Sequence, residues 1–256
     1  MPTADERLAL IRAKVERAKQ HLRDLEIERD RFLKADPYRV VHERDAETGH
    51  HVYRVYDLKT PPGELGLIAG DVIHNLRSAL DHLVYALVVA NGIDPTGKRA
   101  IAFPIHDDAA SYVARSGGQI KLASQSAITA INATEPYQGG RGEALWLLHY
   151  LDIADKHHAL LTSLVNVTGV HLRIPGYWQR EFRSSAEISI LNLRGVLVEG
   201  SVIGTRDPEM KDDMNLTLDI AFTEPGIIRD KPLLPLLVQM SNYVDRLILS
   251  FKPLLA

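Results

Sequence analysis

The sequence contains no cysteine, and this absence excludes several kinds of chemistry at once. Without thiols the chain can form no disulfide, use no cysteine nucleophile and hold no zinc through sulfur. A metal would therefore need histidine and carboxylate ligands. Residues 1–20 also lack the uncharged apolar run of a signal peptide, because charged side chains occur throughout them. We therefore expect a soluble, cytoplasmic protein.

An excess of charge of one sign is missing as well. The chain has 30 basic and 33 acidic residues, a net charge of −3, so any contact with nucleic acid would use a local patch. No stretch approaches the roughly 18 apolar residues that a membrane span needs, and we expect no membrane contact. The length of 256 residues and the 45% hydrophobic content suffice for a large core. The sequence predicts a single domain over 1–256.

The first segment has the pattern of a long helix over 3–34. Thr3 and Glu6 have the spacing of a capping box at its start. Apolar or small residues then follow in steps of three and four, which is a heptad stripe. The stripe consists of Leu8, Ile11, Val15, Ala18, Leu22, Leu25 and Phe32. A helix of this length must lie along a bundle of its own chain or reach out to a second subunit.

The order of the remaining elements predicts the fold class. Two runs rich in valine and tyrosine within 38–58 surround a Glu-Thr-Gly turn, which indicates a β-hairpin. Helical patterns cover 64–90, 107–115, 124–133, 143–164 and 232–251, and strand patterns cover 165–174, 186–193, 195–204 and 214–223. Helices and strands that come in separate runs are typical of an α+β protein. We expect an antiparallel helical bundle in 1–164, with the N-terminal hairpin inserted. A small antiparallel sheet in 165–223 and a last helix in 232–253 that returns to the bundle complete this expectation.

The helix over 64–90 carries the most unusual polar face of the chain. One arc of it is apolar and should face a core. The opposite arc has no lysine, glutamate or glutamine from residue 71 onward, although these residues usually cover a solvated helix face. It holds short polar groups instead: Asp71, His74, Asn75, Arg77, Ser78, Asp81, His82 and Tyr85. Such groups favour specific hydrogen bonds, so this face should meet a helix, a metal or a ligand.

The stretch 74–82, HNLRSALDH, resembles the Arg-x4–6-His motif of the HEPN superfamily. Many members of this superfamily of helical-bundle proteins are metal-independent ribonucleases of toxin, abortive-infection and other defence systems. Arg77, Ser78 and His82 match the motif positions. The resemblance implies RNA as a partner, a homodimer that pairs two motifs across a cleft, and no cofactor. The strand-rich segment 165–223 has no counterpart in a minimal domain of this kind, and the motif lies unusually early in the chain.

The resemblance also implies roles for the motif residues. His82 would act as general acid or base on the ribose 2′-hydroxyl or the leaving 5′-oxygen, and Arg77 would hold the scissile phosphate. The neighbouring polar residues would bind or orient the substrate: His74, Asn75, Ser78 and Asp81. Arg77 and His82 diverge by about 140° around the helix, so they could converge only with help from a partner motif. The spacing of Arg77 and Asp81 equally predicts an ordinary ion pair within the helix.

A second polar helix, over 143–164, leaves two other functions open. His149, Asp152, Lys156 and Ser163 share one stripe, and Asp155, His158 and Thr162 share another. If the first stripe faces the helix over 64–90, a divalent metal could bind to Asp71, His74, His149 and Asp152. The same residues could form a structural network of ion pairs. The alternatives to a ribonuclease or RNA-binding protein are therefore a metal-dependent hydrolase and a non-enzymatic structural or interaction protein.

Overall fold

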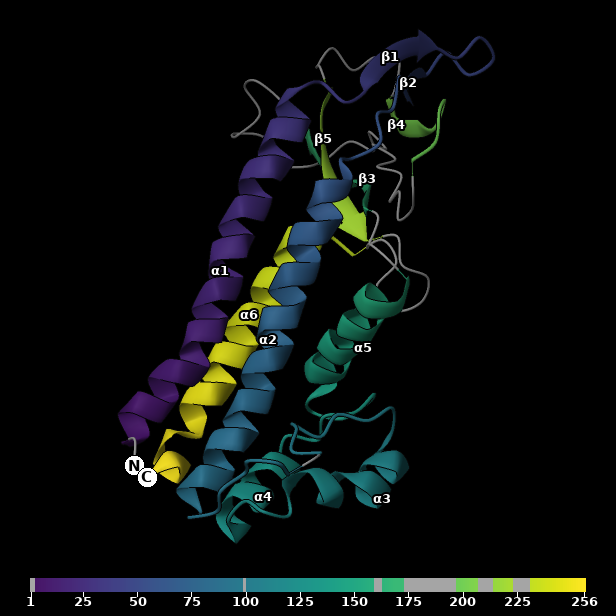
Figure 1. Ribbon diagram of the computed structural model, residues 1–256. Coiled ribbons are helices and arrows are strands. Elements are labelled where there is room, and N and C mark those ends of the chain that lie inside the picture. The colour runs from purple at the N-terminus through teal and green to yellow at the C-terminus, as the bar shows by residue number, and fades with distance from the viewer. Residues whose placement is uncertain (1–2, 99, 159–162, 173–196, 207–213, 223–230) are drawn as a thin grey trace, which may run out of the picture. The chain divides into compact units, whose positions relative to one another are not determined.

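A computed structural model describes residues 3–98, 100–158, 163–172, 197–206, 214–222 and 231–256, and it confirms the α+β class (Figure 1). The helices in these ranges are α1 (Ala4–Lys34), α2 (Gly63–Ala90), α3 (Ala109–Ile120), α4 (Gln125–Asn132), α5 (Glu143–His158) and α6 (Leu233–Ser250). A 3₁₀ turn follows at Lys252–Leu255. The strands are β1 (Arg39–Arg44), β2 (His51–Tyr56), β3 (Ser163–Leu172), β4 (Val202–Arg206) and β5 (Met214–Phe222). None of the helices in these ranges combines the length and the apolar character that crossing a bilayer requires.

The chain divides into two compact units. The first, the helical unit, comprises 1–25, 66–161 and 234–256, and the second, the mixed unit, comprises 26–65 and 162–233. The helices α1 and α2 contribute residues to both. The single domain over 1–256 stays a prediction.

In the helical unit, α1 lies along helices of its own chain. The capping box forms, because Thr3 N donates to Glu6 at 2.7 Å and Glu6 N donates to the Thr3 hydroxyl at 3.2 Å. The heptad stripe is buried from Leu8 to Leu25. On α6, Asp245 accepts from Lys19 at 2.6 Å and from Arg12 at 3.1 Å. Figure 1 shows α1, α2 and α6 side by side, with α5 next to α2.

Helix α2 forms the centre of the helical unit. Its predicted apolar arc is buried, with Leu76, Leu80 and Leu83 at 0% exposure. The helices after it begin at side-chain caps: the Asp108 carboxylate accepts from Ser111 N, and the Ser124 hydroxyl accepts from Ala127 N. These caps start α3 and α4 within two residues of the predicted starts.

The mixed unit contains the predicted hairpin. Strands β1 and β2 pair antiparallel, and β4 pairs with β2, so the order of this sheet is β1-β2-β4. Strands β3 and β5 form a separate antiparallel pair. Buried side chains of this sheet and of Leu197 form a small core, which consists of Tyr53, Val55, Leu197 and Ile203.

Three of the predicted boundaries need comment. The helix over 143–164 was predicted too long, because Ser163 belongs to strand β3 and not to the helix. The strand over 195–204 was also wrong in part, since β4 begins only at Val202 after a turn in which Gly200 has a φ of 79°. The predicted strand over 186–193 lies outside the described residues.

Candidate functional site

Arg77 is buried between α2, α5 and the segment that follows α2. Only 8% of the residue is exposed. Its Nη1 donates to Asp81 Oδ1 at 2.6 Å, its Nη2 to the carbonyl oxygen of Phe103 at 3.1 Å, and its Nε to His149 Nδ1 at 3.3 Å. All three nitrogens of the guanidinium therefore have partners inside the chain, and the ion pair predicted between Arg77 and Asp81 is present.

The Arg77–Asp81 pair holds the peptide groups of Phe103 from both sides. Asp81 Oδ1 accepts from Phe103 N at 2.9 Å, while Arg77 donates to Phe103 O. These bonds satisfy both backbone polar groups of a residue whose ring is fully buried. The pair thus anchors the irregular segment after α2 to the helix itself.

The surroundings of His149 on α5 favour its neutral form. Burial, and next the positive charge of Arg77, lower the pKa of His149 below its ordinary value of 6.5. Because Arg77 donates to Nδ1, the hydrogen of the neutral ring is assigned to Nε2. His149 can therefore donate a hydrogen bond, but its lone pair is occupied.

His74 and Asp152 form a second contact between α2 and α5. His74 Nδ1 lies 3.4 Å from Asp152 Oδ1, and Lys156 Nζ lies 2.6 Å from Asp152 Oδ2. The carboxylate of Asp152 is 5% exposed, whereas the side chain of His74 is 55% exposed. A buried carboxylate thus lies within ion-pair distance of one nitrogen of an imidazole that solvent can reach. Shortening this separation to about 2.6–3.2 Å would let the carboxylate orient the ring as a general base.

Gly70 on α2 makes room for the carboxylate of Asp155 on α5. A Cβ atom on Gly70 would lie 2.5 Å from Asp155 Oδ1, so only glycine allows Asp155 to come this close to α2. Burial, and then the charges of Asp152 and Asp71, raise the pKa of Asp155 above its ordinary value. Asp155 is therefore the carboxyl group of this cluster that is driven toward its protonated form.

Arg77 and His82 do not converge within one chain. His82 is exposed and lines a cavity beside α1, whereas Arg77 points to α5 and Phe103. Of the predicted orienting residues, Asn75 donates to the Asp71 carbonyl of its own helix at 2.8 Å, and Ser78 is half-buried. The structure brings together His74, Asp81 and Arg77 with residues of other segments, and leaves His82 apart from them.

The alternative metal ligands divide between two contacts. His74 lies against Asp152, but the Nδ1 atom of His149 accepts from Arg77, a cation that a metal would have to displace. Across the ranges that the structure describes, no group of three or more histidine, aspartate or glutamate side chains is placed to hold a metal ion. The geometry thus gives no support to a site of Asp71, His74, His149 and Asp152.

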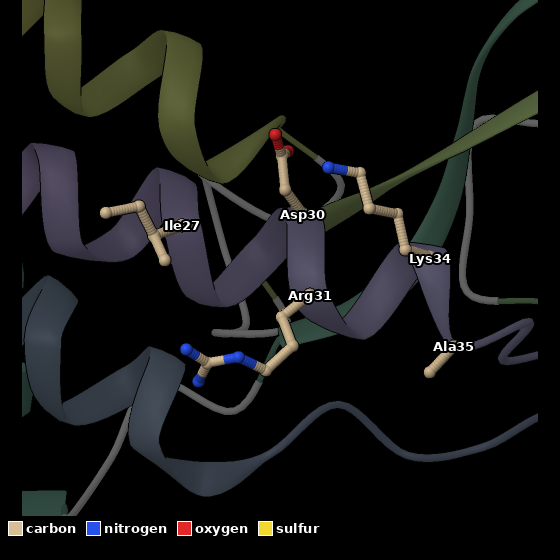
Figure 2. A pocket seen from close by; sticks show the side chains of 5 residues that line it. All are labelled: Ile27, Asp30, Arg31, Lys34 and Ala35. Carbon is tan, nitrogen blue, oxygen red and sulfur yellow. The ribbon is translucent and has the colours of Figure 1, made fainter.

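A hollow of about 460 Å³ lies at the end of α1, in the mixed unit (Figure 2). Figure 2 shows Asp30 and Lys34 extending to one side of the helix and Arg31 to the other. Asp30 pairs with Arg29 at 2.7 Å, and Arg31 pairs with Glu28 on the same helix. The polar groups here do not converge, so this hollow is not a candidate site.

No family model, curated protein or solved structure matches the chain. The resemblance to HEPN proteins therefore stays a prediction that depends on residues 74–82.

We expect His149 to make the stability of the protein depend on pH. Its pKa is lowered on folding, so between the folded value and 6.5 the unfolded chain binds more protons, and stability falls as the pH drops through this window. Asp155 acts in the opposite sense, because its raised pKa makes stability fall as the pH rises from 3.8 through the folded-state pKa. Urea unfolding at four pH values, about 4, 5, 6 and 7, measures both, because this range begins at the ordinary pKa of aspartate and ends above that of histidine.

Two variants separate these contributions. His149→Gln should flatten the rise in unfolding free energy between acidic and neutral pH, and Asp155→Asn should make it steeper. An unchanged slope in His149→Gln would show that this imidazole does not titrate differently in the folded protein.

Proposed function

We propose that this protein is a metal-independent, acid–base ribonuclease whose site is the α2–α5 face, defined as His74, His149, Asp152, Asp155 and Lys156. The observation that carries the proposal is the contact between the exposed His74 and the buried Asp152. An imidazole is the side chain best suited to move protons near neutral pH, and a nearby carboxylate can orient it.

The proposed reaction is an internal transesterification of RNA. His74 Nε2 takes the proton of a ribose 2′-hydroxyl, and the 2′-oxygen forms a bond to phosphorus. The bond from phosphorus to the 5′-oxygen breaks, which leaves a 2′,3′-cyclic phosphate, and Asp155 gives its proton to the departing 5′-oxygen. The raised pKa of Asp155 supports its role as the acid.

The α2–α5 face contains two aspartates and one lysine, but the negative charge of the aspartates is partly compensated. Asp152 has two cationic or cationisable partners, Lys156 and His74. The raised pKa of Asp155 reduces the negative charge that this residue adds to the face. The Lys156 side chain is 51% exposed, and its ammonium group can approach a phosphate oxygen.

The substrate class comes from the HEPN-like resemblance, but the roles of its residues change. Arg77 is proposed as a positioning residue that keeps His149 neutral and α5 against α2, because its nitrogens already have partners. His82 is the other exposed imidazole of α2 and provides the natural control. A role in defence and a homodimer remain proposals that the resemblance implies.

The test compares two histidines of one helix. Cleavage of a single-stranded RNA is measured in EDTA with wild type, His74→Ala and His82→Ala. We expect His74→Ala to lose about a hundredfold in rate, since general acid–base catalysis typically contributes at least that much. His82→Ala should cleave at the wild-type rate.

The remaining outcomes contradict the proposal in different ways. A loss confined to His82→Ala would move the site to the position that the motif resemblance implies. Cleavage that requires a divalent ion would favour a metal-dependent hydrolase. Urea unfolding of both variants tests whether a loss of cleavage is caused by a loss of folding.

A second candidate function, non-enzymatic binding, is favoured by the completeness of the Arg77 contacts. A guanidinium with three partners in its own chain is typical of a structural ion pair. RNA that binds to the wild type without being cleaved in EDTA or with divalent ions would support this function over the ribonuclease.

A further inference from the structure

A cavity of about 480 Å³ lies between α1 and α2 in the helical unit. Leu10 and Ile11 of α1 and Ala86 and Val89 of α2 form apolar parts of its wall. Its volume falls within the roughly 300–1,000 Å³ of small-molecule sites, and such sites are mostly apolar with a few polar groups. None of the residues that define the α2–α5 face lines this cavity.

The same cavity is lined by a buried cation, Arg7, for which the described residues supply no counter-ion. Arg7 is 8% exposed, and its Nη1 donates to the carbonyl oxygen of Leu255 at 2.6 Å. Its Nε is buried without a hydrogen-bond partner. Arg7 forms no ion pair with any of the residues that the structure describes. Burying a charge without compensation is costly, so this guanidinium calls for an anion.

The acidic residue of the cavity does not supply that anion. Asp81 also lines the wall, but its carboxylate is paired with Arg77 at 2.6 Å and accepts from Phe103 N. The uncompensated charge of the cavity is therefore positive. His82 is exposed at the same cavity and can add a second donor.

We propose that this cavity binds a small carboxylate with an apolar body, which places its carboxylate against Arg7 and its body among Leu10, Ile11, Ala86 and Val89. A free inorganic phosphate would leave the apolar wall unused, and a neutral apolar molecule would leave Arg7 without a counter-ion. This site is independent of the proposed ribonuclease activity.

The test uses two ligands that share a body and differ in the head group. Octanoate and octanol are titrated into the full-length protein by isothermal calorimetry at low salt. We expect octanoate to bind at least about tenfold more tightly than octanol, because only octanoate can accept a charge-assisted hydrogen bond from the guanidinium. Equal affinities, or no binding of octanoate, would overturn the proposal.

Two variants locate the binding. Arg7→Met should bring octanoate down to the affinity of octanol. Because Arg7→Met also loses the contact with Leu255, Ala86→Leu provides a second arm by filling the cavity, and it should weaken octanoate at least about tenfold. The control is Val113→Leu, at a position that is 80% exposed and does not line the cavity.

Unchanged octanoate binding in Ala86→Leu would place the ligand elsewhere and overturn the proposal. His74→Ala should bind octanoate like the wild type. The binding test can therefore be interpreted even if the ribonuclease proposal fails.

Discussion

Replacing Arg77 by alanine is expected to lower the free energy of unfolding by about 3 kcal/mol, the lower end of the usual loss for a buried ion pair, because the Arg77 side chain is 10% exposed and that of Asp81 is 37% exposed. The guanidinium has partners on three segments, Asp81 on α2, His149 on α5 and the carbonyl of Phe103. Its removal leaves the carboxylate without its cation and the buried carbonyl without a donor. Both defects destabilise the folded state and not the unfolded chain.

Urea unfolding of wild type and variant measures this loss. The matched control is Arg141→Ala, because Arg141 also pairs with a carboxylate, Glu135 at 3.1 Å, but its side chain is 72% exposed. An exposed pair contributes at most about 1 kcal/mol. If Arg77→Ala lost no more stability than Arg141→Ala while RNA affinity fell, Arg77 would be the phosphate ligand that the motif resemblance implies, and the positioning role would be wrong.

Features that depend on neighbours in sequence were predicted well. The capping box of Thr3 and Glu6, the buried stripe of α1 and the apolar arc of α2 are all set by residues within one or two turns. Periodicity and caps are local signals, so a single sequence contains them. The class of fold follows from the order of these local elements.

Features that depend on residues far apart in the sequence could not be predicted from the hydrophobic periodicity. The burial of Arg7 is one example, because the only side-chain hydrogen bond of Arg7 in the described part of the chain joins it to Leu255, 248 positions away. A charged residue in the first turns of a helix ordinarily points to solvent, and the only signal was its position four residues before the buried Ile11. The cavity beside α2 was therefore missed together with its cation.

The candidate site was predicted in part. Within the α2 polar arc, contacts with other segments are made by His74, Arg77 and Asp81. The spacing of Arg77 and Asp81 indicated their ion pair. The α5 partners of these α2 residues depend on how the two helices pack antiparallel to each other. Arg77 and His149, for example, are in contact although they lie 72 positions apart in the sequence. Sequence alone left that register open, and with it the choice between a metal, a phosphate and an internal network.

The substitution Phe103→Ala tests whether the Arg77–Asp81 pair anchors the segment that contains Phe103 to the core. We expect Phe103→Ala to lower the free energy of unfolding by about 3–5 kcal/mol. The ring is 0% exposed, and the backbone of this residue is held at both N and O by Asp81 and Arg77. A backbone fixed at two points cannot collapse into the space that the ring leaves, so the cavity remains and the full cost is expected.

The control for this variant is Val113→Ala on α3, where the side chain is 80% exposed and a change within about 0.5 kcal/mol is expected. The double variant with Arg77→Ala distinguishes the two explanations. If the pair holds the segment in place, its removal lets the segment move, and the double variant should lose less than the sum of the single losses, since residues that share a contact are not additive. Strict additivity would mean that Phe103 packs without help from the ion pair, and the anchoring role of Arg77 would then be wrong even if its own removal were costly.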